Sequence, residues 1–218
     1  MPRHSSPQSV ESKIGRRIER SARGVVFTAA KFASVGSRAA IGQALARLAA
    51  AGKIRRLSRG LYDKPRQDDL FGKLWPTPEA VITALQQQHS LRLQPAGLYA
   101  ANLLGLSEQV PAKIELLTDA GKNRAVRAGP MVIVLKATSP RSMAAANTYT
   151  GLVIQALKAL GPDHITPERI AHLRTTIPES ERRKMLSKLA LAPSWMRPFL
   201  RQIAERISDA TEKRKVAT

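Results

Sequence analysis

The clearest hydrophobic pattern in the chain follows Ser37 and repeats with the period of an α-helix. Ile41, Leu45 and Leu48 recur four and three residues apart, which places them on one side of a helix. The opposite side carries only small or polar side chains: Ala39, Gly42, Gln43 and Ala46. Ser37 is suited to cap the first turn, and Gly52 is suited to end the helix. We therefore predict a helix between them with one buried face and one small, open face.

Two earlier segments complete a helix-turn-helix. Val10, Ile14 and Ile18 recur every four residues and predict a first helix with arginines on its polar side. Thr28 is placed as the N-cap of a short second helix over residues 28–33. The Ser-Val-Gly-Ser segment that follows has the length of the turn in helix-turn-helix units.

A small basic hairpin is predicted directly after the Ser37 helix. Residues 54–57 and 61–62 have the composition of two short strands around a glycine turn, and residues 25–27 are a further strand that can join them. Lys53 lies at the base of this hairpin, which carries Arg55, Arg56 and Arg59. This order of elements is typical of a winged helix-turn-helix, whose wing lies on phosphates while its second helix enters the major groove. We predict that domain over residues 9–65.

The rest of the chain predicts an α+β fold class overall. Residues 64–76 are interpreted as a linker or crossing arm, with the adjacent Asp68 and Asp69 as a solvated pair. A small mixed α/β domain is expected over residues 77–160, with a helix capped by Thr77 and apolar strands over 114–117 and 131–135. C-terminal helices, the first capped by Thr166, are expected as an extension over residues 161–207. The ends, residues 1–8 and 208–218, have the composition of a disordered lead and a charged tail.

Charge narrows the class of partner. The formal net charge is +20, and residues 1–63 alone carry 13 Lys and Arg against three acids. Such an excess indicates a polyanion, either nucleic acid or an anionic membrane. No stretch of about 20 apolar residues is present, so no membrane span is expected. We expect nucleic acid, and no membrane, as the partner. Aromatic residues make up only 4% of the chain, which favours duplex binding over stacking on single strands.

Cysteine is absent, which excludes disulfides, thiolate metal sites and cysteine nucleophiles and agrees with a reducing cytoplasm. The N-terminus has no apolar core of a signal peptide, so a cytoplasmic protein is expected. His4, His89, His164 and His172 lack the spacing of metal ligands, and no phosphate-binding glycine loop or nucleophile elbow occurs. We expect no enzyme activity, no metal and no cofactor.

The predicted DNA contacts follow from these elements. The wing and the first helix are expected to neutralise phosphates, while Arg38 and Gln43 reach base edges. Arginine pairs naturally with guanine O6 and N7, and glutamine with adenine N6 and N7. The complete set of predicted DNA-binding residues is Arg16, Arg17, Thr28, Ser37, Arg38, Gln43, Arg47, Lys53, Arg55, Arg56 and Arg59.

Two passages resemble a known family. Gly-Lys-Ile-Arg-Arg-Leu-Ser-Arg-Gly-Leu-Tyr-Asp-Lys-Pro (residues 52–65) and Gln-Pro-Ala-Gly-Leu-Tyr-Ala-Ala-Asn-Leu-Leu-Gly-Leu (residues 94–106) are similar to the AbiEi-like antitoxins of type IV toxin–antitoxin systems. The resemblance spans residues 10–160. It implies autorepression by binding inverted or direct repeats in the protein's own promoter. It also implies a cognate toxin, resembling a nucleotidyltransferase, which the antitoxin counters without a stable complex.

Three alternatives remain open. The first is a DNA-binding nuclease, in which Glu115 and Lys136 on neighbouring strands supply a carboxylate and a lysine. The usual motif places the lysine two residues after its carboxylate, where this chain has Leu117. The second is a partner-binding module in which the second domain uses Lys122, Arg124 and Arg127. The third is a plain transcriptional regulator without a toxin partner.

Overall fold

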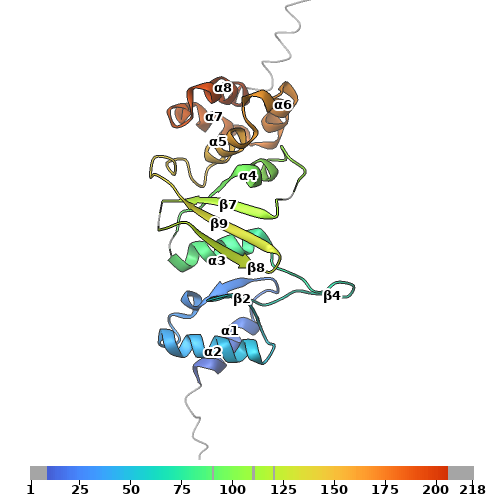
Figure 1. The fold of residues 1–218 in the computed structure, drawn as a ribbon, viewed down its shortest axis with the longest axis vertical. Coiled ribbons are helices and arrows are strands. Elements are labelled where there is room, and N and C mark those ends of the chain that lie inside the picture. Colours follow the sequence, from blue (N-terminus) through green and yellow to red (C-terminus); the bar gives the residue numbers. More distant parts are fainter. Residues whose placement is uncertain (1–8, 90, 110, 120, 206–218) are drawn as a thin grey trace, which may run out of the picture. The chain divides into compact units, whose positions relative to one another are not determined.

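An α+β fold is seen in the computed structural model, which describes residues 9–89, 91–109, 111–119 and 121–205 (Figure 1). The expected lead and charged tail lie outside the described residues. The chain separates into two units. The first contains the chain up to residue 91 together with residues 126–132, and the second contains residues 92–125 and the chain from residue 133 onward.

The first unit begins with the elements expected of a winged helix-turn-helix. They are α1 (Val10–Glu19), β1 (Val26–Thr28), a short 3-10 helix η1 (Ala29–Phe32), α2 (Arg38–Ala50), β2 (Arg55–Ser58) and β3 (Leu61–Asp63). Both β1 and β2 pair antiparallel with β3, so the strand order is β1-β3-β2. Helices α1 and α2 pack side by side (Figure 1). The predicted helices, the glycine turn and the strand that joins the wing are confirmed.

One hydrophobic core holds these elements together. The predicted stripes are buried: Ile14 and Ile18 on α1, and Ile41, Leu45 and Leu48 on α2. Phe27 of β1 and Phe32 of η1 fill the centre with their ring centroids 5.6 Å apart and their planes nearly perpendicular. Edge-to-face contact of this kind stabilises an aromatic pair beyond its buried area.

The segment interpreted as a linker or crossing arm contains two short strands that the sequence did not predict. Strands β4 (Gln67–Asp68) and β5 (Gly72–Lys73) pair antiparallel and form a separate two-stranded sheet. A left-handed backbone at Gly72, with φ at +67°, permits the turn between them. Each strand is only two residues long, which is too short to leave a periodic pattern in the sequence. The charge and glycine content of the segment therefore indicated a loop.

Helix α3 (Pro78–His89) ends the continuous part of the first unit. The Thr77 hydroxyl accepts a hydrogen bond from the Ala80 N–H at 3.4 Å, as predicted for its cap. The helix packs against β1 and η1, so it belongs to the same unit as the wing. The expected domain limit at residue 77 therefore does not coincide with the division that the structure shows.

The second unit combines a sheet with a group of helices. In chain order its elements are β6 (Gln94–Ala96), α4 (Gly97–Leu103), β7 (Lys113–Thr118), β8 (Arg124–Ala128), β9 (Met131–Ala137), α5 (Tyr149–Leu160), η2 (Pro162–His164), α6 (Pro167–Thr176), α7 (Glu179–Ser187), η3 (Leu189–Leu191), η4 (Ser194–Met196) and α8 (Arg197–Ala204). The strand order is β6-β7-β9-β8, with the tip of the β8–β9 hairpin grouped with the first unit. Thr166 caps α6 by accepting from the Arg169 N–H at 3.4 Å, as predicted.

The C-terminal helices are not a separate extension, because they share one core with α4 and α5. Val153 and Leu157 of α5 lie in the same buried cluster as Leu173 of α6, Met185 of α7 and Leu200 of α8. Buried Arg182 on α7 also reaches across this region. Its guanidinium donates to three backbone carbonyls, those of Ile177, Ile203 and Glu205.

Two helical glycines have opposite surroundings, and we predict opposite effects of alanine. At Gly151 in α5, a Cβ atom would lie 2.2 Å from the Ala145 carbonyl oxygen, so Gly151→Ala should destabilise the fold by about 1–3 kcal/mol. At Gly42 in α2 a Cβ atom meets nothing within 4 Å, so Gly42→Ala should stabilise by about 0.5–1 kcal/mol. Urea denaturation followed by circular dichroism measures both, and shifts of the same sign would contradict this packing.

Candidate nucleic-acid interface

Helix α2 presents the open face that its sequence pattern predicts. Ala39, Gly42, Gln43 and Ala46 are all exposed, while the apolar stripe on the other side is buried. No atom lies within 4 Å of the position that a Cβ of Gly42 would take. Gln43 is therefore the one long polar side chain in the middle of a surface otherwise made of methyl groups and backbone. Because these side chains are small, the backbone of α2 can come close to the surface of a ligand.

Both ends of α2 are fixed by local hydrogen bonds. The Ser37 hydroxyl accepts from the Ala40 N–H at 3.3 Å, which confirms the predicted N-cap. At the other end, Gly52 adopts a left-handed backbone with φ at +69°. The Gly52 N–H donates to the Ala49 carbonyl, and the Lys53 N–H donates to the Leu48 carbonyl. This pair of bonds is a Schellman motif, which satisfies the last carbonyls and stops the helix at a defined residue.

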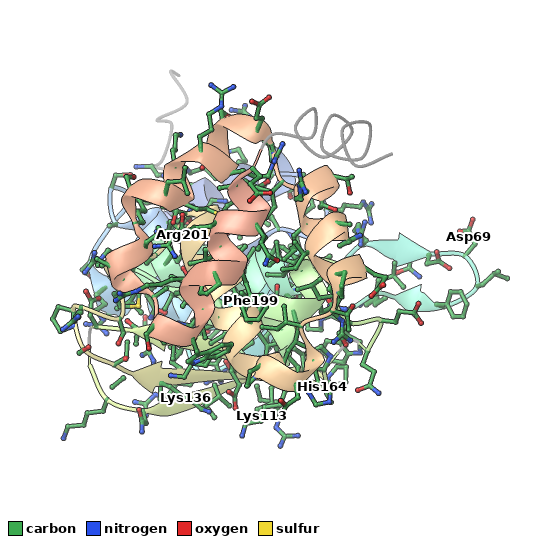
Figure 2. All side chains as sticks on the ribbon, turned by 90° about the horizontal axis from the view of Figure 1, so that it is seen from above. Asp69, Lys113, Lys136, His164, Phe199 and Arg201 are labelled. Atoms are coloured by element: carbon green, nitrogen blue, oxygen red, sulfur yellow. The ribbon has the colours of Figure 1, made fainter. Side chains whose placement is uncertain are left out.

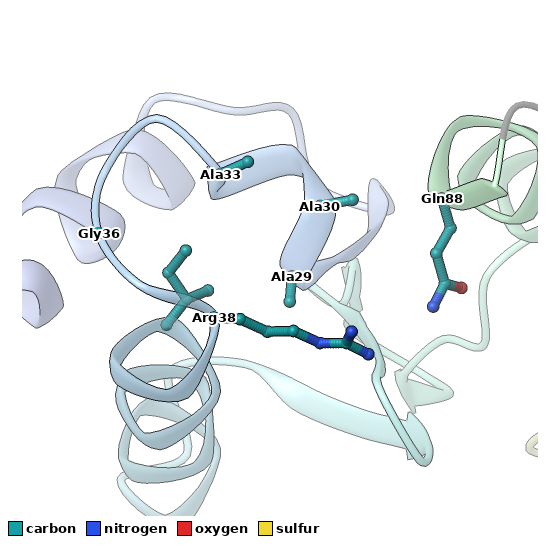
Figure 3. Close-up of a pocket in the computed structure, with 7 residues that line it drawn as sticks. Ala29, Ala30, Ala33, Gly36, Arg38 and Gln88 are labelled. Carbon is teal, nitrogen blue, oxygen red and sulfur yellow. The ribbon is translucent and has the colours of Figure 1, made fainter.

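Arg38 opens α2 and is exposed. Its side chain extends below Ala29 beside an open pocket of about 330 Å³, and the amide of Gln88 on α3 points into the same space (Figure 3). Small residues leave this pocket open: Ala29, Ala30, Ala33 and Gly36. Arg38 makes no ion pair within the part of the chain that the structure describes, so its guanidinium is available to an external acceptor.

Arg55 does not belong to the exposed wing, which corrects its prediction as a DNA contact. Its Nε lies 3.0 Å from Oδ1 of Asp63 and its Nη2 lies 2.6 Å from Oδ2, a bidentate pair across β2 and β3. The same Nη2 donates to the Leu74 carbonyl at 2.7 Å, and the guanidinium carbon lies 4.1 Å from the Trp75 ring centroid. Asp63 is fully buried and only 19% of the Arg55 side chain is exposed. Arg55 therefore stabilises the fold of the first unit and does not extend into solvent toward a ligand.

Arg56 and Arg59 are the exposed cations of the wing. Arg56 follows Arg55 on β2, and strand alternation turns it to the opposite face of the sheet. Arg59 stands in the turn next to Gly60, whose φ is +78°. Neither residue makes an ion pair among the described residues. The wing therefore presents two cations rather than the three that the sequence predicts.

The basic residues on α1 and the far end of α2 are exposed but take part in local contacts. Arg17 donates to the Ser34 hydroxyl at 3.2 Å and lies 5.9 Å from the Phe32 ring centroid, so it ties α1 to the turn. Arg47 pairs with Glu11 at 2.6 Å and links α2 to α1. Exposed pairs of this kind contribute little to stability, and both side chains remain accessible. Arg16 is exposed on the same helix as Arg17.

Thr28, which was predicted to contact DNA, is buried instead. It occupies the predicted position before η1, but its side chain makes no capping hydrogen bond. As part of β1, paired with Leu61, it is only 3% exposed. A threonine in the interior of the wing sheet cannot reach a phosphate. Lys53, by contrast, is exposed just beyond the end of α2, as predicted.

The second unit brings together the two residues of the nuclease alternative. Lys136 on β9 donates to Glu115 on the neighbouring strand β7 at 2.8 Å, and Lys113 lies 3.9 Å from the same carboxylate. Metal-dependent cleavage needs further acidic ligands. Within the described residues, no group of three His, Asp or Glu side chains is placed to hold a metal ion. The geometry therefore supports a surface ion pair across the sheet.

The residues of the partner-binding alternative lie on or beside an edge strand. Lys122, Arg124 and Arg127 are exposed, the last two on β8, which forms one edge of the four-stranded sheet. The exposure of these three side chains agrees with an ordinary solvated edge strand. In the portion of the chain that is described, no helix has the length and apolar character needed to cross a bilayer.

The first unit thus has the element order of a winged helix-turn-helix, with an open face on α2 and two free arginines on the wing. Residues 13–185 match the model of a protein family of unknown function, DUF6088, and the chain belongs to that family. No curated protein matches the chain. The crystal structure of the Rv2827c protein from Mycobacterium tuberculosis is distantly similar, with a TM-score of 0.43, 17% sequence identity, and coverage of 90% of this chain and 76% of that chain.

Sequence reasoning missed two features near this interface. It did not pair Arg55 with Asp63, although Asp63 is the only acid in the predicted wing and lies on the strand opposite. It also overlooked Lys64, whose ammonium donates at 2.8 Å to the carbonyls of both Glu19 and Ser21. These bonds fasten the end of the wing to the end of α1.

The roles of neighbouring wing arginines can be separated by stability. Arg55→Ala leaves the Asp63 carboxylate buried without its partner, and we expect a loss of about 3–5 kcal/mol. Arg56→Ala removes an exposed side chain and should change stability by no more than about 0.5 kcal/mol. Urea denaturation of both variants tests this assignment. Equal stabilities would show that the Arg55–Asp63 pair does not hold the wing.

Proposed function

We propose that this protein binds double-stranded DNA through its first unit and acts as a transcriptional regulator. The observation that carries the proposal is the exposed face of α2, where Gln43 stands among small residues on a helix whose two ends are fixed. A recognition helix must enter the major groove, which is about 12 Å wide, and small side chains allow that approach. The wing follows at once and brings Arg56 and Arg59 to the same unit.

The charge distribution supports the same function. Residues 1–63 carry a net charge of +10, half of that of the whole chain. The exposed basic residues of the first unit that can approach phosphates include Arg16, Arg17, Arg38, Arg47, Lys53, Arg56 and Arg59. Neutralising phosphates with such groups releases counterions, which makes binding strongly dependent on salt.

Base recognition is assigned to the beginning and middle of α2. Arg38 has a free guanidinium with the fork geometry that pairs with guanine O6 and N7. Gln43 lies about one and a half turns further along α2, on the open face that Arg38 flanks, and can pair with adenine N6 and N7. In helix-turn-helix proteins the N-terminal part of the recognition helix makes most base contacts, which agrees with these positions.

The narrower proposal is an autorepressor that serves as the antitoxin of a type IV toxin–antitoxin system. It rests on the resemblance of residues 52–65 and 94–106 to AbiEi-like antitoxins. Under this proposal the DNA site is a set of repeats in the protein's own promoter. The neighbouring gene encodes a nucleotidyltransferase-like toxin, which the antitoxin counters without forming a lasting complex.

Three arginine variants test DNA binding. Arg38→Ala should reduce affinity for the protein's own promoter by about 1–3 kcal/mol and relax the preference for one base pair. Arg59→Ala should weaken binding to promoter and random duplexes alike and lower the salt slope by about one unit. Arg201→Ala, an exposed arginine of the second unit, is the control and should bind as wild type does. Fluorescence anisotropy over a salt series measures all three. If the first two variants bind both duplexes like wild type, the assignment is wrong.

Co-expression tests the antitoxin role. The product of the adjacent open reading frame should arrest growth when produced alone, and this protein should restore growth when produced with it. Arg38→Ala should still restore growth when both genes are driven from foreign promoters, because regulation is then irrelevant. A neighbour that does not affect growth would leave a plain transcriptional regulator as the function.

A further inference from the structure

The hairpin of β4 and β5 forms an arm over residues 66–74. It pairs with no other strand among the described residues, and the Leu74 N–H closes its base by donating to the Arg66 carbonyl at 3.0 Å. Figure 2 shows Asp69 at the outer end of this arm, away from the body of the first unit. A two-stranded hairpin by itself is only marginally stable in water. An arm of this kind gains stability if another surface covers it.

The tip of the arm is held in one conformation. Oδ1 of Asp68 accepts hydrogen bonds from the N–H groups of both Leu70 and Phe71 at 3.0 Å. These bonds, that from Phe71 first, hold the pKa of the Asp68 carboxyl below its usual value, so it is ionised at neutral pH. A fixed turn presents its next two side chains without the entropy loss of ordering a flexible loop.

Those two side chains are apolar and almost wholly in solvent. Leu70 is 88% exposed and Phe71 is 78% exposed, whereas every other exposed large hydrophobic residue in the described chain is below 50%. Single apolar side chains on a surface are ordinary, but two adjacent ones on a hydrogen-bonded turn at the end of an arm can form a contact surface. Arg55 fixes the arm at its other end by donating to Leu74 and covering Trp75.

Charge determines which kind of partner the tip suits. Asp68 and Asp69 are the only two adjacent acids in a chain of net charge +20. Arg66 and Lys73 balance these acids over the arm as a whole, but Asp69 at the outer end makes the tip itself a poor match for phosphates. The carboxylates at the tip favour a partner surface that is apolar and carries cations. The chain itself is strongly basic, so a second copy meets this requirement.

Near the base of the arm, the first unit contains a hollow with an apolar lining and lysines at its rim. It has a volume of about 200 Å³ and is lined by apolar residues, Ile18, Leu48 and Ile54. The hollow exists because Gly15 has no side chain there, and Lys53 and Lys64 stand at its rim with Glu19 as the one acid. A cavity of about 150 Å³ is enough to hold a benzene ring, so a phenylalanine side chain fits.

We propose that two copies of this chain exchange arms. The Leu70–Phe71 tip of each copy fills the hollow of the other, and Asp69 lies against the lysines at its rim. Lys64 both lines the hollow and directly precedes Pro65 and the arm, so each tip reaches the base of the other arm. This reciprocal contact has the self-complementary geometry of a two-fold dimer. It does not depend on DNA binding, and the free protein tests it.

Sedimentation velocity in about 0.15 M salt, where the Debye length is about 8 Å, measures the association. Wild type should form dimers. The double variant Leu70→Ser, Phe71→Ser should raise the dissociation constant at least about tenfold, because two apolar side chains no longer leave water. Leu186→Ser removes a side chain of α7 that is 49% exposed and should leave the association unchanged. Gly15→Leu should fill the hollow and abolish dimers while the arm stays intact.

Cross-linking identifies the contact itself, because the chain contains no cysteine. A Leu70→Cys protein mixed with a Glu19→Cys protein should form a disulfide-linked heterodimer under mild oxidation. The Gly15→Leu substitution in the second protein should prevent it, and a Leu186→Cys protein in place of the first should give only background. If wild type remains a monomer wherever it is soluble, or if Gly15→Leu and the tip variant dimerise as wild type does, arm exchange is refuted.

Discussion

The Arg55–Asp63 ion pair connects the parts of the first unit that matter for function. Asp63 has no contact with solvent, so its carboxylate requires a partner, and the register of β2 against β3 places Arg55 directly opposite. The same guanidinium binds the Leu74 carbonyl and covers Trp75, which lie beyond the arm in sequence. One buried charge pair thus fixes the wing, the base of the arm and the approach to α3. A guanidinium suits this role because its planar donors bind a carboxylate and a carbonyl at once.

The proposed DNA surface and the proposed dimer surface meet at Lys53, which is assigned to phosphates and also stands at the rim of the hollow. The reading face of α2 consists of Ala39, Gly42, Gln43 and Ala46, and the wing adds Arg56 and Arg59. The hollow lies between α1 and the C-terminal end of α2, where Gly15 has no side chain over the buried Leu48. A protein of net charge +20 repels its own copies, and phosphates that neutralise the first unit reduce this repulsion. Duplex binding and arm exchange are therefore compatible and can reinforce each other.

Local patterns were sufficient to predict much of the fold. The α1 and α2 stripes, the caps at Ser37, Thr77 and Thr166 and the glycine turn of the wing all depend on residues within a few positions of one another. The open face of α2 followed from the same periodicity, so Gln43 was correctly placed on the surface. The division into units did not follow. α3 joins the wing, and the C-terminal helices join α4 and α5, through contacts between residues far apart in the chain.

The sequence by itself determined where most of the helices and longer strands lie and that the basic charge is concentrated at the amino-terminal end. It could not determine which basic residues remain free, because a free and a buried arginine have the same local sequence signature. Only strand register placed Arg55 on Asp63 and turned Arg56 outward, and only the β1–β3 pairing buried Thr28. For the arm, the sequence offered a linker or a crossing arm, and only the tertiary structure showed its two strands and its exposed tip. The strands are too short for a periodic pattern, and the exposure of Leu70 and Phe71 depends on which residues pack over them.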